Sequence, residues 1–313
     1  MTDDQFHKPV MVREVVDSLC CKRGGIYLDG TLGGGGHAYE ILKKISPDGI
    51  LIGIDIDDDA LLESEKRLKP FGNRKILMKA NYADMSNILA DLNISKVDGI
   101  FLDLGVSSHQ LKTAERGFSF SLAAPLDMRM DHSRGKSAYD LINTLPDKEL
   151  ERIIRDYGEE IMAGRIAKAI SARRKRSPIK TTAELAAIVV ESLPPAFRRK
   201  RIHPATKTFQ AMRIAVNNEL LNLTRAINSG IDMLGREGRF SIISFHSLED
   251  RIVKNFFRSW EKGCICPPDL PVCSCRRKTK VKVLTRKPVI PGEAEIVSNP
   301  RARSAKLRTA ERI

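Results

Sequence analysis

The feature that most constrains the fold is an alternation of short apolar runs with amphipathic stretches through the first third of the chain. The run at Ile50–Asp55 is almost wholly apolar, as expected of a strand buried on both faces of a parallel sheet. Further strands are expected over 26–29, 75–79 and 97–104, and helices over 38–45, 57–69 and 85–92. The pattern predicts an α/β fold with a doubly wound sheet.

The alternation stops after Leu104 and resumes a hundred or so residues later. Between these points only helices are expected, over 147–157, 159–173 and 181–192. The later elements expected are a helix over 211–234, a turn at 235–238, a strand over 239–245, an amphipathic helix over 248–260, and strands over 281–284 and 305–310. We therefore expect an α/β domain formed by 1–110 and 211–313, with a helical substrate-recognition domain inserted at 111–210.

The chain is strongly basic, with a net charge of +14. Basic runs lie at Arg173–Arg176 and Arg198–Arg201, and the segment from Arg276 to the end has twelve Lys or Arg against three Glu. This clustering favours a polyanion partner held through its phosphates over a generally basic surface. Aromatic residues make up only 5% of the chain, which favours recognition by shape and pocket over an extended stacking surface.

Nothing in the sequence indicates a membrane or secretory protein. No apolar run approaches the roughly 20 residues that cross a bilayer. The first residues include Asp3 and Asp4 and lack the basic-then-apolar pattern of a signal peptide. We expect a cytoplasmic protein with no membrane partner. The oligomeric state is left open, and a homodimer is one alternative.

The glycine-rich segment Asp29–His37 lies between the first strand and the first helix, where doubly wound folds bind ligands. It is not a phosphate-binding loop of the Gly-Lys-Ser/Thr type. It also fails the dinucleotide pattern, because Tyr39 stands where the last glycine would follow Gly34 and Gly36. A nucleoside that carries methionine and lacks phosphates fits better; a tight turn alone is the alternative.

Two aspartates end later strands beside this segment. Asp55 is placed to accept hydrogen bonds from ribose hydroxyls and would repel a phosphorylated ribose, although a solvated carboxylate is the alternative. Asp103 would lie beside the reactive end of the cofactor.

Several motifs together resemble one family, the bacterial 16S ribosomal RNA (cytosine-N4) methyltransferases, RsmH or MraW. The resemblance runs from about His7 to the C-terminus. The motifs are Asp29–Thr31 with Gly33–His37, Leu102–Ser108, Glu115–Phe120, Pro125–Asp131, His203–Thr206, Thr208–Gln210, Ser241–Arg251 and Asn299–Ser304.

The resemblance implies S-adenosylmethionine as cofactor, a class I methyltransferase sheet, and methylation of a cytidine amine in the decoding region of 16S rRNA within the 30S subunit. It implies that Tyr82 packs on the adenine, for which a core aromatic is the alternative. The implied cofactor-binding residues are Gly35, Gly36, His37, Asp55, Tyr82, Asp103 and Gln110.

Asp103 is the candidate catalytic residue. A cytosine amine is a poor nucleophile, so an acceptor for its N–H groups would concentrate electron density on nitrogen. Amino-directed methyltransferases often place Asp/Asn-Pro-Pro-aromatic here, whereas this chain has Asp103-Leu104-Gly105-Val106. The residue that stacks on the target base is therefore unassigned, and Ser107 and Ser108 are candidates to line the pocket.

The cysteines do not favour carbon-5 chemistry, because Cys20 and Cys21 precede the first strand and are poorly placed as nucleophiles. Cys264, Cys266, Cys273 and Cys275 form two Cys-x-Cys pairs, whereas zinc sites more often use Cys-x-x-Cys. Reduced thiols are favoured over a metal there, and no metal is predicted.

Two polar side chains, His246 and Arg129, have more than one possible role. For His246, beside Glu249, packing or RNA contact is favoured over acid–base work. Arg129 contacts either RNA phosphate or a neighbouring carboxylate, Asp127 or Asp131.

Three other functions compete with methylation of rRNA. The first is a nucleotide-dependent oxidoreductase, against which the failed dinucleotide motif argues. The second is a non-catalytic RNA-binding factor, against which the intact Gly35, Gly36, Asp55 and Asp103 argue. The third is a DNA amino methyltransferase, against which only the family resemblance argues.

Overall fold

The computed structural model describes residues 9–121, 123–198, 202–264, 266, 272, 274–275 and 277–313. The chain divides into two compact units, Met1–Gly105 with Leu220–Ile313, and Val106–Glu219. The boundaries between the units thus differ from the domain boundaries expected after residues 110 and 210. The second boundary lies later in the chain because the helix at Thr206–Asn217 contributes Phe209, Ala211 and Met212 to the apolar core of the second unit.

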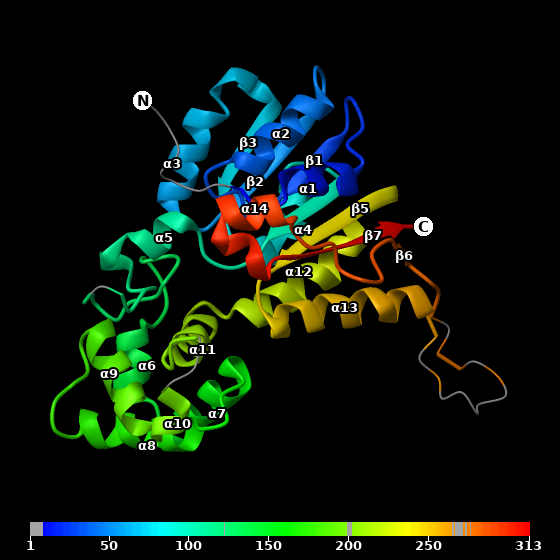
Figure 1. Ribbon diagram of the computed structural model, residues 1–313. Coiled ribbons are helices and arrows are strands. Elements are labelled where there is room, and N and C mark those ends of the chain that lie inside the picture. Colours follow the sequence, from blue (N-terminus) through cyan, green and yellow to red (C-terminus); the bar gives the residue numbers. More distant parts are fainter. Residues whose placement is uncertain are drawn as a thin grey trace. The chain divides into compact units, whose positions relative to one another are not determined.

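A seven-stranded sheet with the order β3-β2-β1-β4-β5-β7-β6 forms the centre of the first unit (Figure 1). Its strands are β1 (Ile26–Asp29), β2 (Ile50–Asp55), β3 (Lys75–Lys79), β4 (Val97–Asp103), β5 (Leu234–Ser244), β6 (Val281–Val283) and β7 (Lys306–Arg312). The first five are parallel, and β7 is antiparallel to both β5 and β6. The strand order reverses between β1 and β4, which makes their carboxyl ends the position where such sheets bind ligands.

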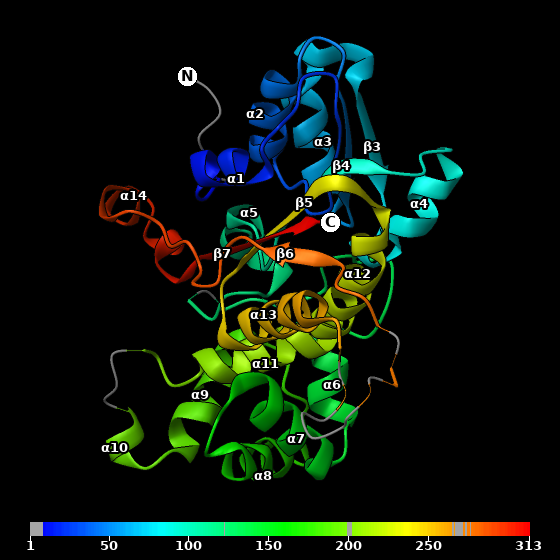
Figure 2. The same ribbon diagram turned by 90° about the vertical axis from the view of Figure 1, so that its right-hand side faces the viewer.

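Helices cover both faces of this sheet (Figure 2). The helical elements are α1 (Val12–Leu19), α2 (Gly36–Ile45), α3 (Asp58–Arg67), η1 (Lys69–Arg74), η2 (Tyr82–Asp84), α4 (Met85–Asp91), α12 (Glu219–Met233), α13 (Ser247–Lys262), α14 (Glu293–Ser298) and η4 (Pro300–Ser304). Alternate strand residues explain the two layers, since Leu28 packs with α4, α12 and α13 while Tyr27 packs with α1 and α2. The α/β architecture predicted for this part of the chain is confirmed.

The second unit is helical and has its own apolar core, to which Leu150, Ile166 and Leu185 belong. Its elements are α5 (Ser108–Lys112), η3 (Ala114–Arg116), α6 (Ala138–Thr144), α7 (Asp147–Gly158), α8 (Ala163–Arg174), α9 (Thr182–Ser192), α10 (Pro195–Arg198) and α11 (Thr206–Asn217). None of the helices in the described part of the chain combines the length and the apolar character needed to cross a bilayer.

The predicted boundaries of three elements are wrong. The single helix expected over 211–234 is two helices, because Asn218 has a left-handed φ of 51° between α11 and α12. Likewise Glu159, at φ 48°, ends α7, so α8 begins at Ala163 rather than at 159. Strand β5 begins at Leu234, and the expected turn is an irregularity within it between the pairs Val97–Leu234 and Gly99–Arg239.

Candidate active site

Three aspartates gather at the carboxyl edge of the sheet. Asp29 ends β1, Asp55 ends β2 and Asp103 ends β4. In the parallel register Asp29 lies beside Gly53 and Phe101, so the other two carboxylates extend two residues past it on either side. Their charges interact: that of Asp55 raises the pKa of Asp29, and that of Asp29 raises the pKa of Asp103.

Burial, more than this mutual repulsion, raises the pKa of all three groups. It raises the pKa of Asp29 to about 7 and that of Asp55 to about 6, and it holds the pKa of Asp103 well above its ordinary value. Within the described residues, the groups acting on Asp29 and Asp55 are backbone amides, Thr31 and other carboxylates, rather than a Lys or Arg. Buried acids with no cationic partner of this kind form a site suited to a cationic ligand.

Asp55 fastens the glycine turn to the second strand. Its Oδ2 accepts a hydrogen bond from the Gly33 amide at 2.8 Å, and its Oδ1 accepts one from the Asp57 amide at 2.9 Å. Gly33 itself has a φ of +51°. Because each carboxylate oxygen has a second lone pair, Asp55 retains acceptor capacity toward a ligand.

Gly35 and Gly36 allow other parts of the chain to approach the backbone closely. A Cβ on Gly35, whose φ is +73°, would lie 3.1 Å from the Cβ of Ser64. A Cβ on Gly36, the first residue of α2, would lie 2.8 Å from the Cγ of Pro9. Packing therefore requires both glycines, beside any contact that they make with a cofactor.

His37 lies against Asp103. Its Nε2 is 2.8 Å from the carbonyl oxygen of Val10, which can only accept, so Nε2 carries the proton and Nδ1 is the nitrogen that faces Asp103. The distance from Nδ1 to Asp103 Oδ2 is 3.8 Å. The ring also packs against Phe101, with centroids 4.7 Å apart. The structure thus brings two of the predicted site residues together.

Tyr82 lies beside the start of the glycine turn. A Cβ on Gly30 would come within 3.0 Å of the Tyr82 Cβ and 2.5 Å of Leu102 Cδ2. Tyr82 also packs against the main core of the first unit. The two alternatives from the sequence are therefore compatible, because one face of the ring can be core while the residue borders the site.

Gln110 belongs to the second unit. It is buried. Its side-chain Oε1 accepts a hydrogen bond from the backbone amide of Ser107 at 3.0 Å, and its backbone amide donates to Ser107 Oγ at 3.1 Å. This capping box begins α5. The side chain thus has a structural role, and its contact with a cofactor stays a prediction.

Asp29 and Thr31 were not predicted from the sequence as site residues. Asp29 is 1% exposed, and its Oδ2 is buried without a hydrogen-bond partner among the described residues. The Thr31 hydroxyl oxygen accepts from the Asp103 amide at 2.6 Å and so joins the turn to β4. The signal was present, since Asp29 ends a buried strand just as Asp55 and Asp103 do.

Two side chains with open roles have structural partners. His246 is the N-cap of α13, where Glu249 Oε2 accepts from the amides of Phe245 and His246 at 2.9 and 3.3 Å. This supports packing over acid–base work. Arg129 makes a two-pronged contact with Asp127, at 2.9 and 2.8 Å, which lowers the pKa of that carboxyl. This is the carboxylate contact that the sequence allowed; contact of Arg129 with RNA phosphate stays a prediction.

Parts of the basic runs are also structural. Arg174 donates to the carbonyls of Ile142 and Leu145, both at 2.6 Å, and Arg198 donates to those of Leu193 and Glu191 at 2.7 and 2.9 Å. Arg199, Lys200, Arg201, Cys273 and Arg276 lie outside the described residues.

The antiparallel β7 between β5 and β6, the glycine turn after β1 and the strand-end carboxylates define the fold of a class I methyltransferase. The match to a known protein family supports this class of protein. The profile of the MraW methylase family matches residues 4–313, and the chain belongs to that family.

The relatives include curated proteins named Ribosomal RNA small subunit methyltransferase H. That of Syntrophus aciditrophicus is 64% identical over 98% of both chains, and that of Geotalea uraniireducens is 53% identical over 99% of both. Among solved structures, an rRNA methylase from Streptococcus thermophilus is 9% identical with a TM-score of 0.42, over 96% of this chain and 93% of that one. A SAM-dependent O-methyltransferase from Thermotoga maritima is 10% identical with a TM-score of 0.42, over 100% of this chain and 68% of that one.

Proposed function

We propose that this methylase transfers the methyl group of S-adenosylmethionine to the N4 amine of a cytidine in the decoding region of 16S rRNA, within the small ribosomal subunit. The substrate class is supported by the names of the close relatives. The observation that carries the proposal on this chain is the cluster of Asp29, Asp55 and Asp103 around the glycine turn.

The residues of the cluster fit the cofactor. S-adenosylmethionine has a positive sulfonium and a positive ammonium but no phosphate, and when bound it supplies an electrophilic methyl group. Carboxylates favour these cations, and the buried Asp29 Oδ2 is an acceptor available to a ligand donor. Asp55 would hold the ribose hydroxyls, and Gly35, Gly36, His37, Tyr82 and Gln110 would complete the site.

Asp103 would act on the acceptor amine. As a carboxylate it accepts a hydrogen bond from the cytosine NH₂, which concentrates electron density on N4. Burial raises its pKa, so the ionised form depends on nearby positive charge. The cationic cofactor would supply that charge.

Positive side chains would hold the RNA. Lys254, Arg258 and Arg286 line a cavity of about 330 Å³ beside Arg308, on α13 and the segment that follows β6. Within the described residues, Arg308 pairs with Asp250, whereas no such pair involves the other three. We propose this cavity as a phosphate contact, and the helical second unit as the substrate-recognition domain.

The test is methyl transfer from labelled S-adenosylmethionine to 30S subunits, naked 16S RNA, tRNA and duplex DNA, followed by nucleoside analysis. We expect N4-methylcytidine from the ribosomal substrate alone. Label in DNA or tRNA would contradict the substrate, label at another atom would contradict the reaction, and retention on NAD instead of S-adenosylmethionine would contradict the cofactor.

A further inference from the structure

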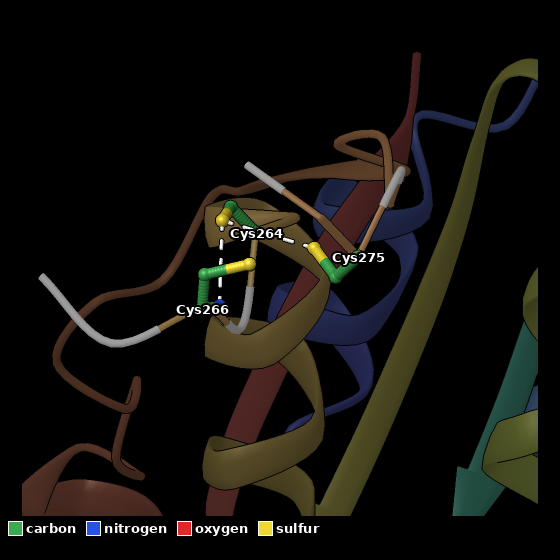
Figure 3. A group of neighbouring side chains, drawn as sticks. All are labelled: Cys264, Cys266 and Cys275. Carbon is green, nitrogen blue, oxygen red and sulfur yellow. Dashed lines mark hydrogen bonds between the residues drawn. The ribbon is translucent and has the colours of Figure 1, made fainter. Parts of the chain in front are cut away.

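Three cysteine sulfurs converge just beyond the end of α13 (Figure 3). The sulfurs of Cys264, Cys266 and Cys275 all lie within 4.8 Å of one another. All three residues are partly buried. Their position lies outside the methyl-transfer site, and neither the proposed reaction nor the proposed RNA contact uses them.

The distance between two of these sulfurs matches that of a tetrahedral thiolate site. Zn–S bonds of about 2.3 Å at tetrahedral angles place two sulfurs about 3.8 Å apart. The Cys264 and Cys275 sulfurs are 3.8 Å apart. This distance is far longer than a disulfide bond.

The segment that carries the cysteines is closed at its base, where α13 ends and the chain approaches β6. The Lys280 amide donates to the Trp260 carbonyl at 3.0 Å. A Cβ on Gly263 would lie only 2.7 Å from the Thr279 nitrogen, so the two arms of the segment are in direct contact there. Cys264 and Cys275 are thereby held opposite each other before any metal binds.

Local donors and charges also suit bound thiolates. The Cys266 amide points to the Cys264 sulfur at 3.4 Å, and Ser274 Oγ lies 3.7 Å from the Cys266 sulfur. Arg277 and Lys278 follow in the sequence and are exposed. Hydrogen-bond donors and neighbouring cations stabilise negative sulfur.

We propose that Cys264, Cys266 and Cys275 bind one zinc ion, whose fourth ligand comes from the protein or from solvent. Thiolates bind zinc in preference to magnesium or calcium. The Cys-x-Cys spacing of Cys264 and Cys266 is not typical of a zinc site, but Cys275 supplies a third sulfur from the part of the chain that leads to β6. The ion would join Cys264, next to the end of α13, to Cys275, and would thereby hold Arg277 and Lys278 near the end of α13.

The test is the metal content of the full-length protein purified under reducing conditions, for the wild type, Cys264→Ser/Cys275→Ser and the control Cys20→Ser. Cys20 is exposed and precedes β1, so its loss leaves the cluster intact. We expect about one zinc per chain in the wild type and the control, and at least about a tenfold loss in the double variant. Zinc that is absent from the wild type, equally retained by the double variant, or replaced by iron would overturn the proposal.

A second measurement does not depend on a folded variant. Cobalt added to the metal-free wild type should give the intense thiolate charge-transfer and tetrahedral d–d absorption of a Co–S site, and zinc should abolish both. A cobalt spectrum typical of oxygen ligands would overturn the site and leave only a sulfur–sulfur hydrogen bond. Neither readout involves methylation, so the outcome is separate from that of the proposed function.

Discussion

Two regions of the first unit bury carboxylates in opposite ways. At the contact of α13 with β7, Asp250 meets Arg308 Nε at 2.6 Å and Lys306 Nζ at 3.6 Å, and these cations lower its pKa. At the carboxyl edge of the sheet, burial raises the pKa of Asp29 to about 7 and that of Asp55 to about 6. Asp250 has its cations within the protein, whereas we propose that Asp29 and Asp55 serve the cofactor, which would supply a cation.

The largest effect is expected at Asp103. Asp103→Ala should lower kcat at least about a hundredfold, because the acceptor for the amine is lost. The fold should remain, since the backbone bond from residue 103 to Thr31 does not need the carboxylate. Single-turnover methyl transfer and thermal melting measure the two effects, with the exposed Asp91→Ala as control. Full activity of Asp103→Ala would remove Asp103 from the mechanism.

The paired region should respond in stability instead. Asp250→Asn should lower the free energy of unfolding by about 2–3 kcal/mol, because it leaves the buried Arg308 without a charged partner. Affinity of the folded protein for S-adenosylmethionine should not change. Urea unfolding measures the free energy of unfolding, and calorimetric titration measures the affinity for S-adenosylmethionine. A fall in affinity without a fall in stability would show that the two regions do not differ in this way.

Asp29→Asn should show the reverse pattern. Removal of the buried charge should weaken S-adenosylmethionine binding about tenfold, a loss of roughly 1.4 kcal/mol. It should also raise the stability of the ligand-free protein at pH 8 by on the order of 1 kcal/mol. The sign follows because the folded state raises the pKa of Asp29 from 3.8 to about 7. The wild-type protein therefore loses stability as pH rises through this range, and Asp29→Asn removes that loss. Unchanged affinity would show that Asp29 is not a ligand residue.

The same titration should appear in cofactor binding. A cation binds the ionised carboxylate, so affinity for S-adenosylmethionine should rise between pH 6 and pH 8 as Asp29, with a pKa of about 7, loses its proton. The rise should flatten in Asp29→Asn and persist in Asp250→Asn, whose carboxyl has a lowered pKa. Calorimetry across this range, with buffers of different ionisation enthalpy, would count the released protons; none released would contradict the assignment.

The smallest effect concerns cations around the cavity on α13. Lys254→Ala/Arg258→Ala should weaken RNA binding and reduce the slope of log affinity against log salt by about 1–2, as expected for two lost phosphate contacts. Cofactor affinity should be unaffected. A matched change at Lys148, a basic residue of α7 in the second unit, serves as the comparison. An unaltered slope would show that these unpaired cations do not contact phosphate.

Much of this protein follows from its sequence because the signals are local. The apolar run of β2 and the periodic helices that flank it predict the sheet, and a carboxylate that ends a buried strand predicts a ligand at the carboxyl edge. The ends of the helices were predicted less accurately than their existence. Asn218 ends α11 through a single left-handed residue, and Asn217 uses its side chain on the Met128 carbonyl, a contact remote in sequence.

Only the tertiary structure decided which polar groups have partners. Arg129, Arg174 and Arg198 looked available to RNA but are used by carboxylates or carbonyls, whereas Asp29 is buried with an oxygen left over. Likewise, spacing alone argued against a metal, and the return of Cys275 brought three sulfurs together. The physical reason is common to all these cases: composition and periodicity determine which surfaces are buried, but a hydrogen bond, an ion pair or a ligand cluster depends on distances of a few ångströms between segments far apart in the chain.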